Sequence, residues 1–476
     1  MKKVELQDIQ GFLLKGYGKM RTSRYYLLKV EDKDLAKKWI DQISNDISDG
    51  EHHPETTSLN IAFTHPGLSA LGMAAENLRN FAREFREGMD TAHRNRMLGD
   101  LGSSDPRNWR WGSKTNETVT NEQNIHCMLM VFALDDLVLA EYSKELETVF
   151  LSMGMSIVLP LDGQLLPDNK IHLGFRDGIG QPAIAGTGRV AHPNNVVATG
   201  EFILGYQNEY GVYSDSPFIT VQQGDTNLLP VDAGGSGLKD IGHNGSYLVY
   251  RQMEERVDIF WSYINEKTKS ENGSLNEVES IKLAAKMVGR WPSGAPLVKF
   301  PDADPGGLID DDDFGYQPDD GLGQKCPFGS HIRRSNPRNA FEDNNPKKSI
   351  SLTNKHRIIR RGRSYGESLV GTPTNHHSKD EIGLHFMCFN TDISNQFEFI
   401  MHTWANFPGF QNLYHDPDPL VGVSDVEQPD KIPQNFTIQG CPINKTVTDL
   451  QRFVTIKGGA YFFFPSITAI KYLATI

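Results

Sequence analysis

One short segment places a carboxylate where it could approach a ligand. HLGFRDGIGQPA, residues 172–183, has glycines on both sides of Asp177. Glycine has no Cβ, so the backbone can turn tightly there and come close to a large planar molecule. An Asp-Gly pair is also common in ordinary turns. The motif alone therefore leaves a ligand-binding turn and a plain structural turn open.

A second segment, CPFGSHIRRSNPRN, places His331 close to Arg333, Arg334 and Arg338. An axial ligand of haem iron is a neutral imidazole, and cations beside it can meet the haem propionates. This segment offers both features. A buried, hydrogen-bonded structural histidine is the alternative interpretation.

A third segment, HRIIRRGRSYG, carries four arginines within seven residues, from Arg357 to Arg363. Ile358 and Ile359 indicate that at least one neighbouring guanidinium lies close to the interior. An arginine held near a buried aspartate is suited to peroxide chemistry, because it stabilises developing negative charge. A solvated basic surface is the alternative.

Composition excludes several classes of protein. The 476 residues include 48 Lys and Arg against 60 Asp and Glu, a formal net charge of −12. An acidic chain is poorly suited to phosphate backbones or anionic lipid, so we expect neither nucleic-acid nor membrane partners. The four cysteines are far apart and form no C-x-x-C pair, which argues against a zinc ribbon, an iron–sulfur cluster and covalently attached haem.

The N-terminal sequence predicts the cellular location. MKKVELQDIQGFLL runs from basic residues straight into acidic and polar ones, without the apolar core of a secretory signal. No apolar run approaches the length of a membrane helix. With its separated thiols, the chain is expected to be a cytoplasmic protein in a reducing compartment.

The stretch Asp302–Gly321 is strongly acidic and could be a calcium loop. Asp302, Asp304, Asp310 and Asp313 fall near ligand positions of a twelve-residue calcium motif. A glycine at position five, Pro305 and a final Asp in place of Glu spoil the match. A solvated acidic loop is the alternative.

Hydrophobic periodicity predicts recurring strand-then-helix units. In the first half, predicted strands are residues 24–30, 58–63, 125–133 and 155–161, and predicted helices are residues 33–43, 66–78 and 134–153. In the second half, predicted strands are 246–251 and 383–390, predicted helices run through 260–264 and 393–404, and a hairpin is expected around Gly458-Gly459.

This pattern favours an α+β fold with two halves, each an antiparallel β-sheet packed with helices. Gly-rich, aperiodic sequence at residues 224–245 suggests the boundary between them. We therefore predict an N-terminal half of residues 1–230, which carries Asp177. Residues 231–476 form the predicted C-terminal half, which carries His331 and Arg360.

Taken together, the segments resemble the dye-decolorising (DyP-type) peroxidases, a haem b family, and its larger soluble subgroup in particular. The matching stretches are ELQDIQGFLLKGYGKM, GFRDG, GRWPSGAPL, CPFGSHIRRSNPRN, RIIRRGRSYG, GLHFMCFN and GGAYFFFPS. They run in this order from residue 5 to about residue 466, so the resemblance covers essentially the whole chain.

The resemblance implies two ferredoxin-like halves and a non-covalent haem b held mainly by the C-terminal half. His331 is similar to the iron ligand, Asp177 to the distal acid–base residue and Arg360 to the distal arginine, with Arg361 as the alternative register. The remaining implied cofactor-binding residues are Leu384 and Phe386 on the distal face, Arg338 beside a propionate, and Asp418 as acceptor of the imidazole N–H.

The implied activity is peroxidation. Hydrogen peroxide would form a ferryl intermediate, and bulky dyes, phenols or other aromatic compounds would be oxidised in one-electron steps, at surface sites such as Tyr365, Trp404 or Tyr414. A monomer or homodimer is expected. Two alternatives stay open: a haem-binding protein of this fold that handles iron or haem with weak turnover, and a haem-free calcium-dependent interaction protein.

Overall fold

The centre of the protein is one antiparallel sheet closed into a barrel. The computed structural model describes residues 3–115, 118, 120–341, 345–423 and 434–476. Its strand order is β10-β12-β11-β4-β1-β3-β2-β15-β9, and a further pairing of β9 with β12 closes the ring. The strands are β1 (Thr22–Val30), β2 (Thr57–Phe63), β3 (Cys127–Ala133), β4 (Met155–Gln164), β9 (Ser246–Glu255), β10 (Ile359–Arg360), β11 (Arg363–Tyr365), β12 (Gly383–Asn390) and β15 (Val454–Phe464).

Each half of the chain contributes one run of strands with the ferredoxin-like order. The first half gives β4-β1-β3-β2, and the second gives β11-β12-β9-β15. The two runs meet at single residue pairs, Ser364 with Gln164 and Phe463 with Phe63. The predicted α+β fold of two ferredoxin-like halves is confirmed. Closure of both sheets into one barrel removes exposed strand edges.

Helices cover the outside of the barrel. Asp32 and Asp135 cap α2 (Lys33–Ile43) and α7 (Asp136–Ser152), and Trp39 of α2 packs edge-on against Phe150 of α7. The other helices are α1 (Gly11–Leu14), α3 (His65–Ala70), α4 (Ala75–Leu78), α5 (Arg83–Glu87), α6 (Ala92–Leu98), α8 (Val257–Thr268), α9 (Glu277–Val288), α10 (His331–Ser335), α11 (Pro346–Asn354) and α12 (Ile467–Leu473), with π-helical turns at Ser394–Glu398 and Ile400–Ala405.

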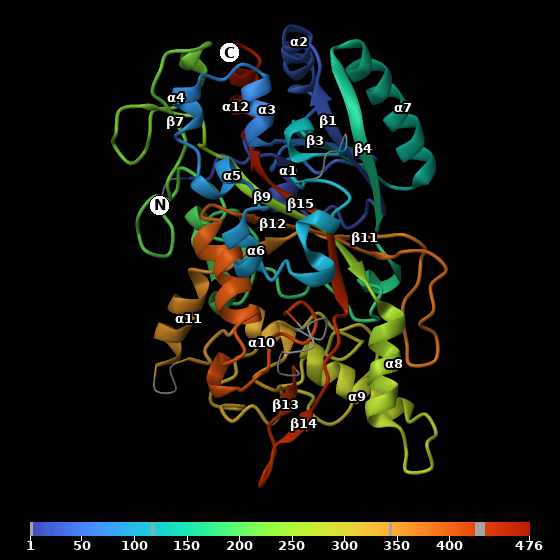
Figure 1. The fold of residues 1–476 in the computed structure, drawn as a ribbon. Coiled ribbons are helices and arrows are strands. Elements are labelled where there is room, and N and C mark those ends of the chain that lie inside the picture. The colour runs from blue at the N-terminus through green and yellow to red at the C-terminus, as the bar shows by residue number, and fades with distance from the viewer. Residues whose placement is uncertain (1–2, 116–117, 119, 342–344, 424–433) are drawn as a thin grey trace.

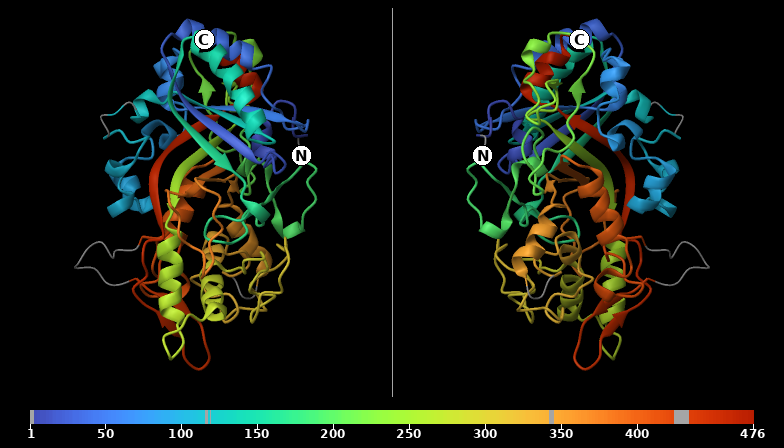
Figure 2. Two further views of the ribbon diagram at one scale, coloured as in Figure 1. Left: turned by 90° about the vertical axis from the view of Figure 1, so that its right-hand side faces the viewer. Right: turned by 90° about the vertical axis from the view of Figure 1, so that its left-hand side faces the viewer.

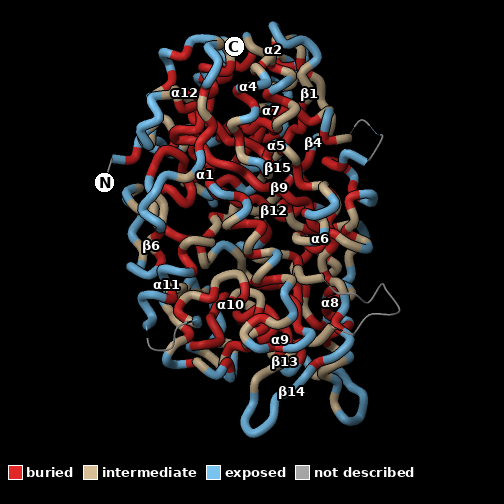
Figure 3. The backbone as a smooth tube through the Cα atoms, turned by 60° about the vertical axis from the view of Figure 1, so that its left-hand side comes forward, coloured by how far each residue is buried: buried red, intermediate tan, exposed pale blue. Residues whose placement is uncertain are grey.

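The two ends of the molecule differ in character (Figure 1). The helices α2, α3, α7 and α12 surround the strands of the first half at one end, whereas α8 to α11 and long connections fill the other. The long strands β9 and β15 run side by side between these ends (Figure 2). Burial is concentrated on the central strands, and the β13–β14 end is largely exposed (Figure 3). The site described below lies where the barrel meets the second end.

Short elements complete the connections. The small strands are β5 (Ala183–Ile184), β6 (Val196–Val197), β7 (Phe218–Ile219), β8 (Lys239–Asp240), β13 (Phe436–Ile438) and β14 (Lys445–Val447). The 3-10 turns are Gly102–Ser104, Pro106–Asn108, Glu122–Asn124, Pro167–Asn169, Pro193–Asn195, Thr199–Glu201, Thr226–Leu228 and Phe410–Asn412. The predicted division at residues 230/231 falls in such a region and stays a prediction. Among the described residues, the search for a helix long and apolar enough to cross a membrane finds none.

The hairpin expected around Gly458-Gly459 is wrong, because β15 continues through both glycines as one strand. Its register against β9 shifts between Ile456 and Gly458, which marks a β-bulge. A Cβ at Gly458 would clash with the indole nitrogen of Trp111. These glycines therefore permit close packing and do not turn the chain.

Candidate active site

The seven predicted site residues line a single cavity. It encloses about 1670 Å³ of space between protein atoms, part of it in the open mouth. The segment 171–180, strands β9, β10, β12 and β15, helix α10 and the π-helical turns form its wall. The predicted residues in the wall are Asp177, His331, Arg338, Arg360, Leu384, Phe386 and Asp418.

The first polar group in the cavity is the proximal pair, His331 and Asp418. His331 is the first residue of α10, and its Nδ1 lies 2.9 Å from Oδ2 of Asp418. A carboxylate can only accept, so Nδ1 carries the proton of this hydrogen bond, and Nε2 is the ring nitrogen that makes no hydrogen bond to Asp418. The Asp418 side chain is 1% exposed, and that of His331 is 23% exposed.

The environment of Asp418 holds it in the ionised form. Burial alone would raise its pKa, but the charge and hydrogen bond of His331, the charge of Arg334 and a backbone hydrogen bond together lower the pKa below its usual range. Its other oxygen accepts the backbone N–H groups of Leu420 and Val421 at 2.9 and 3.1 Å. The carboxylate therefore fixes the imidazole orientation.

The second polar group is the distal pair, Asp177 and Arg360. Nη1 of Arg360 lies 3.1 Å from Oδ1 of Asp177, and the two side chains are 30% and 32% exposed. Gly178 follows with φ of +82°, a conformation that a side-chain-bearing residue rarely adopts. Gln181 accepts the backbone N–H of Arg360 at 2.9 Å. The turn thus presents the carboxylate to the cavity beside a guanidinium.

Arg361 points away from the cavity. Its side chain donates to the carbonyl oxygens of Phe12 and Leu13 at 2.9 and 2.8 Å. Burial lowers its pKa to about 9. Of the two alternative registers, Arg360 is the one that lines the cavity and pairs with Asp177.

Apolar side chains from neighbouring strands form one wall. Leu384 and Phe386 occupy alternate positions on β12, and so face the same side of the sheet. Met253 on β9 pairs with Leu384, and Val454 on β15 pairs with Glu255. All of these side chains reach the cavity.

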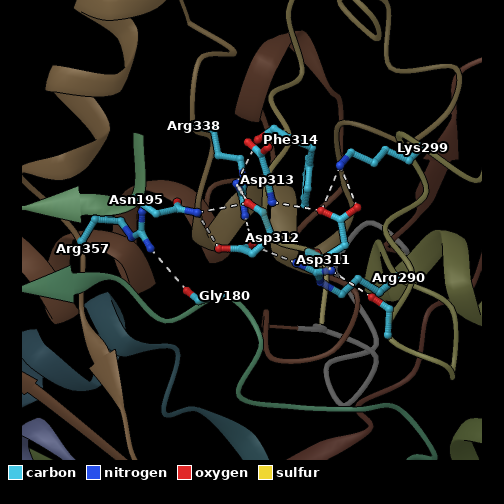
Figure 4. Close-up of polar contacts among 11 residues, drawn as sticks. Gly180, Asn195, Arg290, Lys299, Asp311, Asp312, Asp313, Phe314, Arg338 and Arg357 are labelled. Carbon is cyan, nitrogen blue, oxygen red and sulfur yellow. Dashed lines mark hydrogen bonds and ion pairs between the residues drawn. The ribbon is translucent and has the colours of Figure 1, made fainter. Parts of the chain in front are cut away.

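The acidic segment does not line the cavity itself but forms ion pairs with arginines of its wall (Figure 4). Asp312 receives the guanidinium of Arg290 at 2.9 Å and also binds that of Arg338. Arg338 further donates to the carbonyl oxygens of Asp312 and Phe314, and its guanidinium lies 3.9 Å from the Phe314 ring centroid. Burial lowers the pKa of Arg290 to about 10, with the Asp312 charge opposing.

This pairing argues against the calcium loop. The neighbouring aspartates also face protein cations or a histidine: Asp310 with Arg176, Asp311 with Lys299 and Asp313 with His192. Within the described part of the chain, which includes the whole segment, no group of three or more His, Cys, Asp or Glu could hold a metal ion. The spacing of the aspartates suggested calcium because a local pattern does not show which cations from elsewhere in the chain pair with them.

Sequence reasoning assigned no role to two further polar residues in the wall. Arg357 belongs to the arginine-rich motif but received no role; it is buried and donates to the Gly180 carbonyl oxygen at 3.3 Å (Figure 4). Burial lowers its pKa to about 10. Glu255 ends β9, and strand alternation from Met253 could have indicated its direction.

The three candidates for surface oxidation lie in different settings. Tyr414 is 80% exposed. Tyr365 is buried, and its hydroxyl donates to Glu381 at 3.1 Å. Trp404 is also buried, beside Phe341 and Phe399. Only Tyr414 of the three therefore presents its ring to solvent.

The chemistry of the cavity suits haem. One imidazole nitrogen is available as an axial ligand, and the apolar wall suits a porphyrin face. Two buried wall atoms, Nη1 of Arg176 and Oδ1 of Asn336, lack a hydrogen-bond partner. Buried polar atoms are normally satisfied, so these two indicate a ligand that carries polar groups. Arg338 and Arg357 supply positive charge for carboxylates.

Comparison with known sequences agrees with this geometry. Residues 8–167 match the family model described as the DyP dimeric alpha+beta barrel domain. The chain is 30% identical to Peroxidase 2 of Mycetinis scorodonius over 98% of this chain and 87% of that protein. It is 28% identical to the dye-decolorizing peroxidase of Exidia glandulosa, over 97% of this chain and 86% of that one.

Solved structures agree as well. An ancestral D-type dye-decolorizing peroxidase superposes with a TM-score of 0.77 at 26% identity, covering 100% of both chains. A DyP-type peroxidase of Anabaena superposes with a TM-score of 0.75 at 25% identity, covering 98% of this chain and 94% of the other.

Proposed function

The chain belongs to the dye-decolorising peroxidase family, and we propose that its proximal and distal pairs divide the reaction between cofactor binding and proton transfer. It is a peroxidase that uses hydrogen peroxide to oxidise dyes and other aromatic compounds. The observation that carries our assignment of residues is that both pairs, on segments far apart in sequence, line one cavity.

We assign cofactor binding to the proximal pair and its surroundings. Nε2 of His331 would hold the iron of haem b, with Asp418 accepting the Nδ1 proton and making the imidazole more electron-donating. Leu384 and Phe386 would cover the porphyrin. Arg338 would meet a propionate, with Arg357 beside it. When bound, haem supplies the iron centre that accepts two oxidising equivalents from peroxide and passes them to substrate one electron at a time.

We assign proton transfer to the distal pair. The Asp177 carboxylate takes a proton from one oxygen of hydrogen peroxide and returns it to the other, which leaves as water. Arg360, 3.1 Å away, pairs with the Asp177 carboxylate and stabilises negative charge that develops as the O–O bond breaks. The partial exposure of both side chains lets the site exchange protons with solvent.

Bulky reducing substrates require a second point of contact. The part of the cavity around Asp177 and Arg360, the distal chamber, is where peroxide would react. A dye molecule is too large to share this chamber with peroxide, so we propose oxidation at the surface. Tyr414 is the exposed candidate among the residues considered. A substitution tests this role: Tyr414→Phe should slow dye oxidation without slowing the reaction with peroxide.

The proposal is tested by the absorption spectrum of the haem-loaded protein before and after one equivalent of hydrogen peroxide. We expect a haem band that shifts within seconds and returns when a phenol is added. A haem band that peroxide leaves unchanged would instead support the iron- or haem-handling alternative. Absence of any haem band would contradict the whole assignment.

Three further expectations remain proposals. Hydrogen peroxide and aromatic reductants are the expected partners, and the chain acts as a monomer or homodimer. All four cysteines are free thiols, three of them buried, which supports the expected reducing, cytoplasmic setting.

A further inference from the structure

A second carboxyl group lies in the cavity beside the distal pair. Glu255 is the last residue of β9, and its side chain reaches the cavity although the residue is only 4% exposed. Its neighbours on the same face are apolar: Met253 on β9, Leu384 on β12 and Val454 on β15. Oε2 accepts the backbone N–H of His172 at 3.1 Å.

Four of the five arginines in the cavity wall are committed to other carboxylates, and the fifth, Arg357, donates to the Gly180 carbonyl oxygen. Arg360 pairs with Asp177, Arg176 with Asp310, and both Arg290 and Arg338 with Asp312. In the part of the chain that the structure describes, Glu255 forms no ion pair. Its neighbour Glu254 differs, since that carboxylate lies 2.9 Å from Lys457.

A buried carboxylate without a cation is costly, whereas the neutral acid is tolerated in an apolar wall. We propose that Glu255 is a second proton-holding residue beside the distal pair, protonated near neutral pH, and that its ionisation in alkaline solution slows the reaction with peroxide. This inference rests on the proposed function of the distal pair.

The surroundings of Glu255 favour its neutral form. Burial and the nearby charge of Asp177 raise the pKa of Glu255 to about 8, opposed only by the His172 backbone hydrogen bond. Other charged or titratable groups that face the same cavity are Arg176, Arg290, His331, Arg338, Arg357, Arg360 and Asp418.

The consequence for the reaction is electrostatic. When Glu255 is neutral, Arg360 faces only one carboxylate, that of Asp177. Its positive charge can then also stabilise the negative charge that develops on the peroxide oxygen. When Glu255 loses its proton to solvent, the chamber carries a second negative charge that Arg360 cannot balance. We expect the reaction with peroxide to slow by about tenfold as pH rises through the Glu255 transition.

The first test needs no cofactor. Infrared spectra of the cofactor-free protein are recorded across pH 5 to 10 for wild type, Glu255→Gln and Glu201→Gln. Glu201 is a matched control, because it is also buried with a pKa raised to about 8 but lies outside the cavity. We expect Glu255→Gln to lose a protonated-carboxyl band that wild type loses near pH 8.

The second test uses the haem-loaded proteins and stopped-flow absorption after peroxide. The alkaline slowing should vanish in Glu255→Gln and persist in Glu201→Gln. If Glu255→Gln does not fold, Glu255→Met removes the same carboxyl from the apolar wall and is tested in its place.

Two results would overturn the inference: a Glu255 carboxyl already ionised at pH 6, or alkaline slowing that persists without it. Failure of the proposed function is distinguishable, because then neither wild type nor variants would respond to peroxide while the infrared result would stand.

Discussion

The proximal and distal pairs use the same kind of acidic side chain in contrasting environments. Asp418 is 1% exposed and takes four stabilising contributions, from His331, Arg334 and two backbone N–H groups. Asp177 is 32% exposed and faces one guanidinium. The first arrangement fixes a ligand in one orientation, and the second leaves a carboxylate able to exchange protons. The difference in burial therefore distinguishes the carboxylate that orients a ligand from the carboxylate that can take part in a reaction.

The largest expected effect comes from removing the ligand of the proximal pair. His331→Ala should abolish haem binding or greatly weaken it, because no other imidazole lines the described cavity. The haem absorption band after titration of the cofactor-free protein measures this. The surface variant His377→Ala should bind haem like wild type, and equal binding by His331→Ala would contradict the assignment.

Variants of the distal pair should affect the rate and spare the cofactor. Asp177→Asn should slow the peroxide-driven spectral change by about 10²–10⁴-fold, the usual size of general acid–base catalysis. Arg360→Leu should slow it by about 10²–10³-fold through lost charge stabilisation. Stopped-flow absorption measures both rates, with the exposed Asp449→Asn as control. Unchanged rates in both variants would exclude the distal pair from proton transfer.

A smaller effect is expected when the proximal carboxylate is neutralised. Asp418→Asn keeps the shape of the side chain but loses the charge that orients His331. Such partners of a metal ligand typically contribute about 10–100-fold in affinity. Titration with haem should therefore show weaker binding by about that factor. Haem affinity equal to that of wild type would mean that Asp418 does not orient the ligand.

The smallest effect concerns acid stability. The pKa of Asp418 is lowered in the folded protein, so its contribution to stability is present above the unfolded pKa and is lost as pH falls through the folded value. Urea unfolding of the cofactor-free protein should show a shallower loss of stability below about pH 4 in Asp418→Asn than in wild type. If the free energy of unfolding fell with pH in the same way in both proteins, the interactions of Asp418 with His331 and Arg334 would not stabilise the folded state.

The sequence predicts most of the site because its chemistry is concentrated in short motifs. Asp177 lies between glycines, and His331 and Arg360 lie in arginine-rich segments, so each became a candidate locally, and the family resemblance then implied its role. Asp418 was the hardest of these residues to place by sequence, and the structure puts it 2.9 Å from His331. Features that depend on distant partners were missed or misjudged.

Three examples show what local patterns leave out. Alternation identifies strands but not which edges join, so closure of the barrel through Gln164 and Ser364 was not foreseen. The aspartates near Asp312 suggested calcium because Arg290 and Arg338 become their neighbours only in the fold. Sequence reasoning gave Glu255 no role, and only its burial in the cavity wall sets it apart.

The division of labour between the two pairs is tested most directly by measuring two quantities on the same proteins. Haem affinity and the rate of the peroxide-driven spectral change are determined for wild type, Asp177→Asn and Asp418→Asn. We predict that Asp177→Asn loses rate at unchanged affinity, whereas Asp418→Asn loses affinity. Loss of affinity in Asp177→Asn at an unchanged rate of the haem-loaded protein would contradict this account.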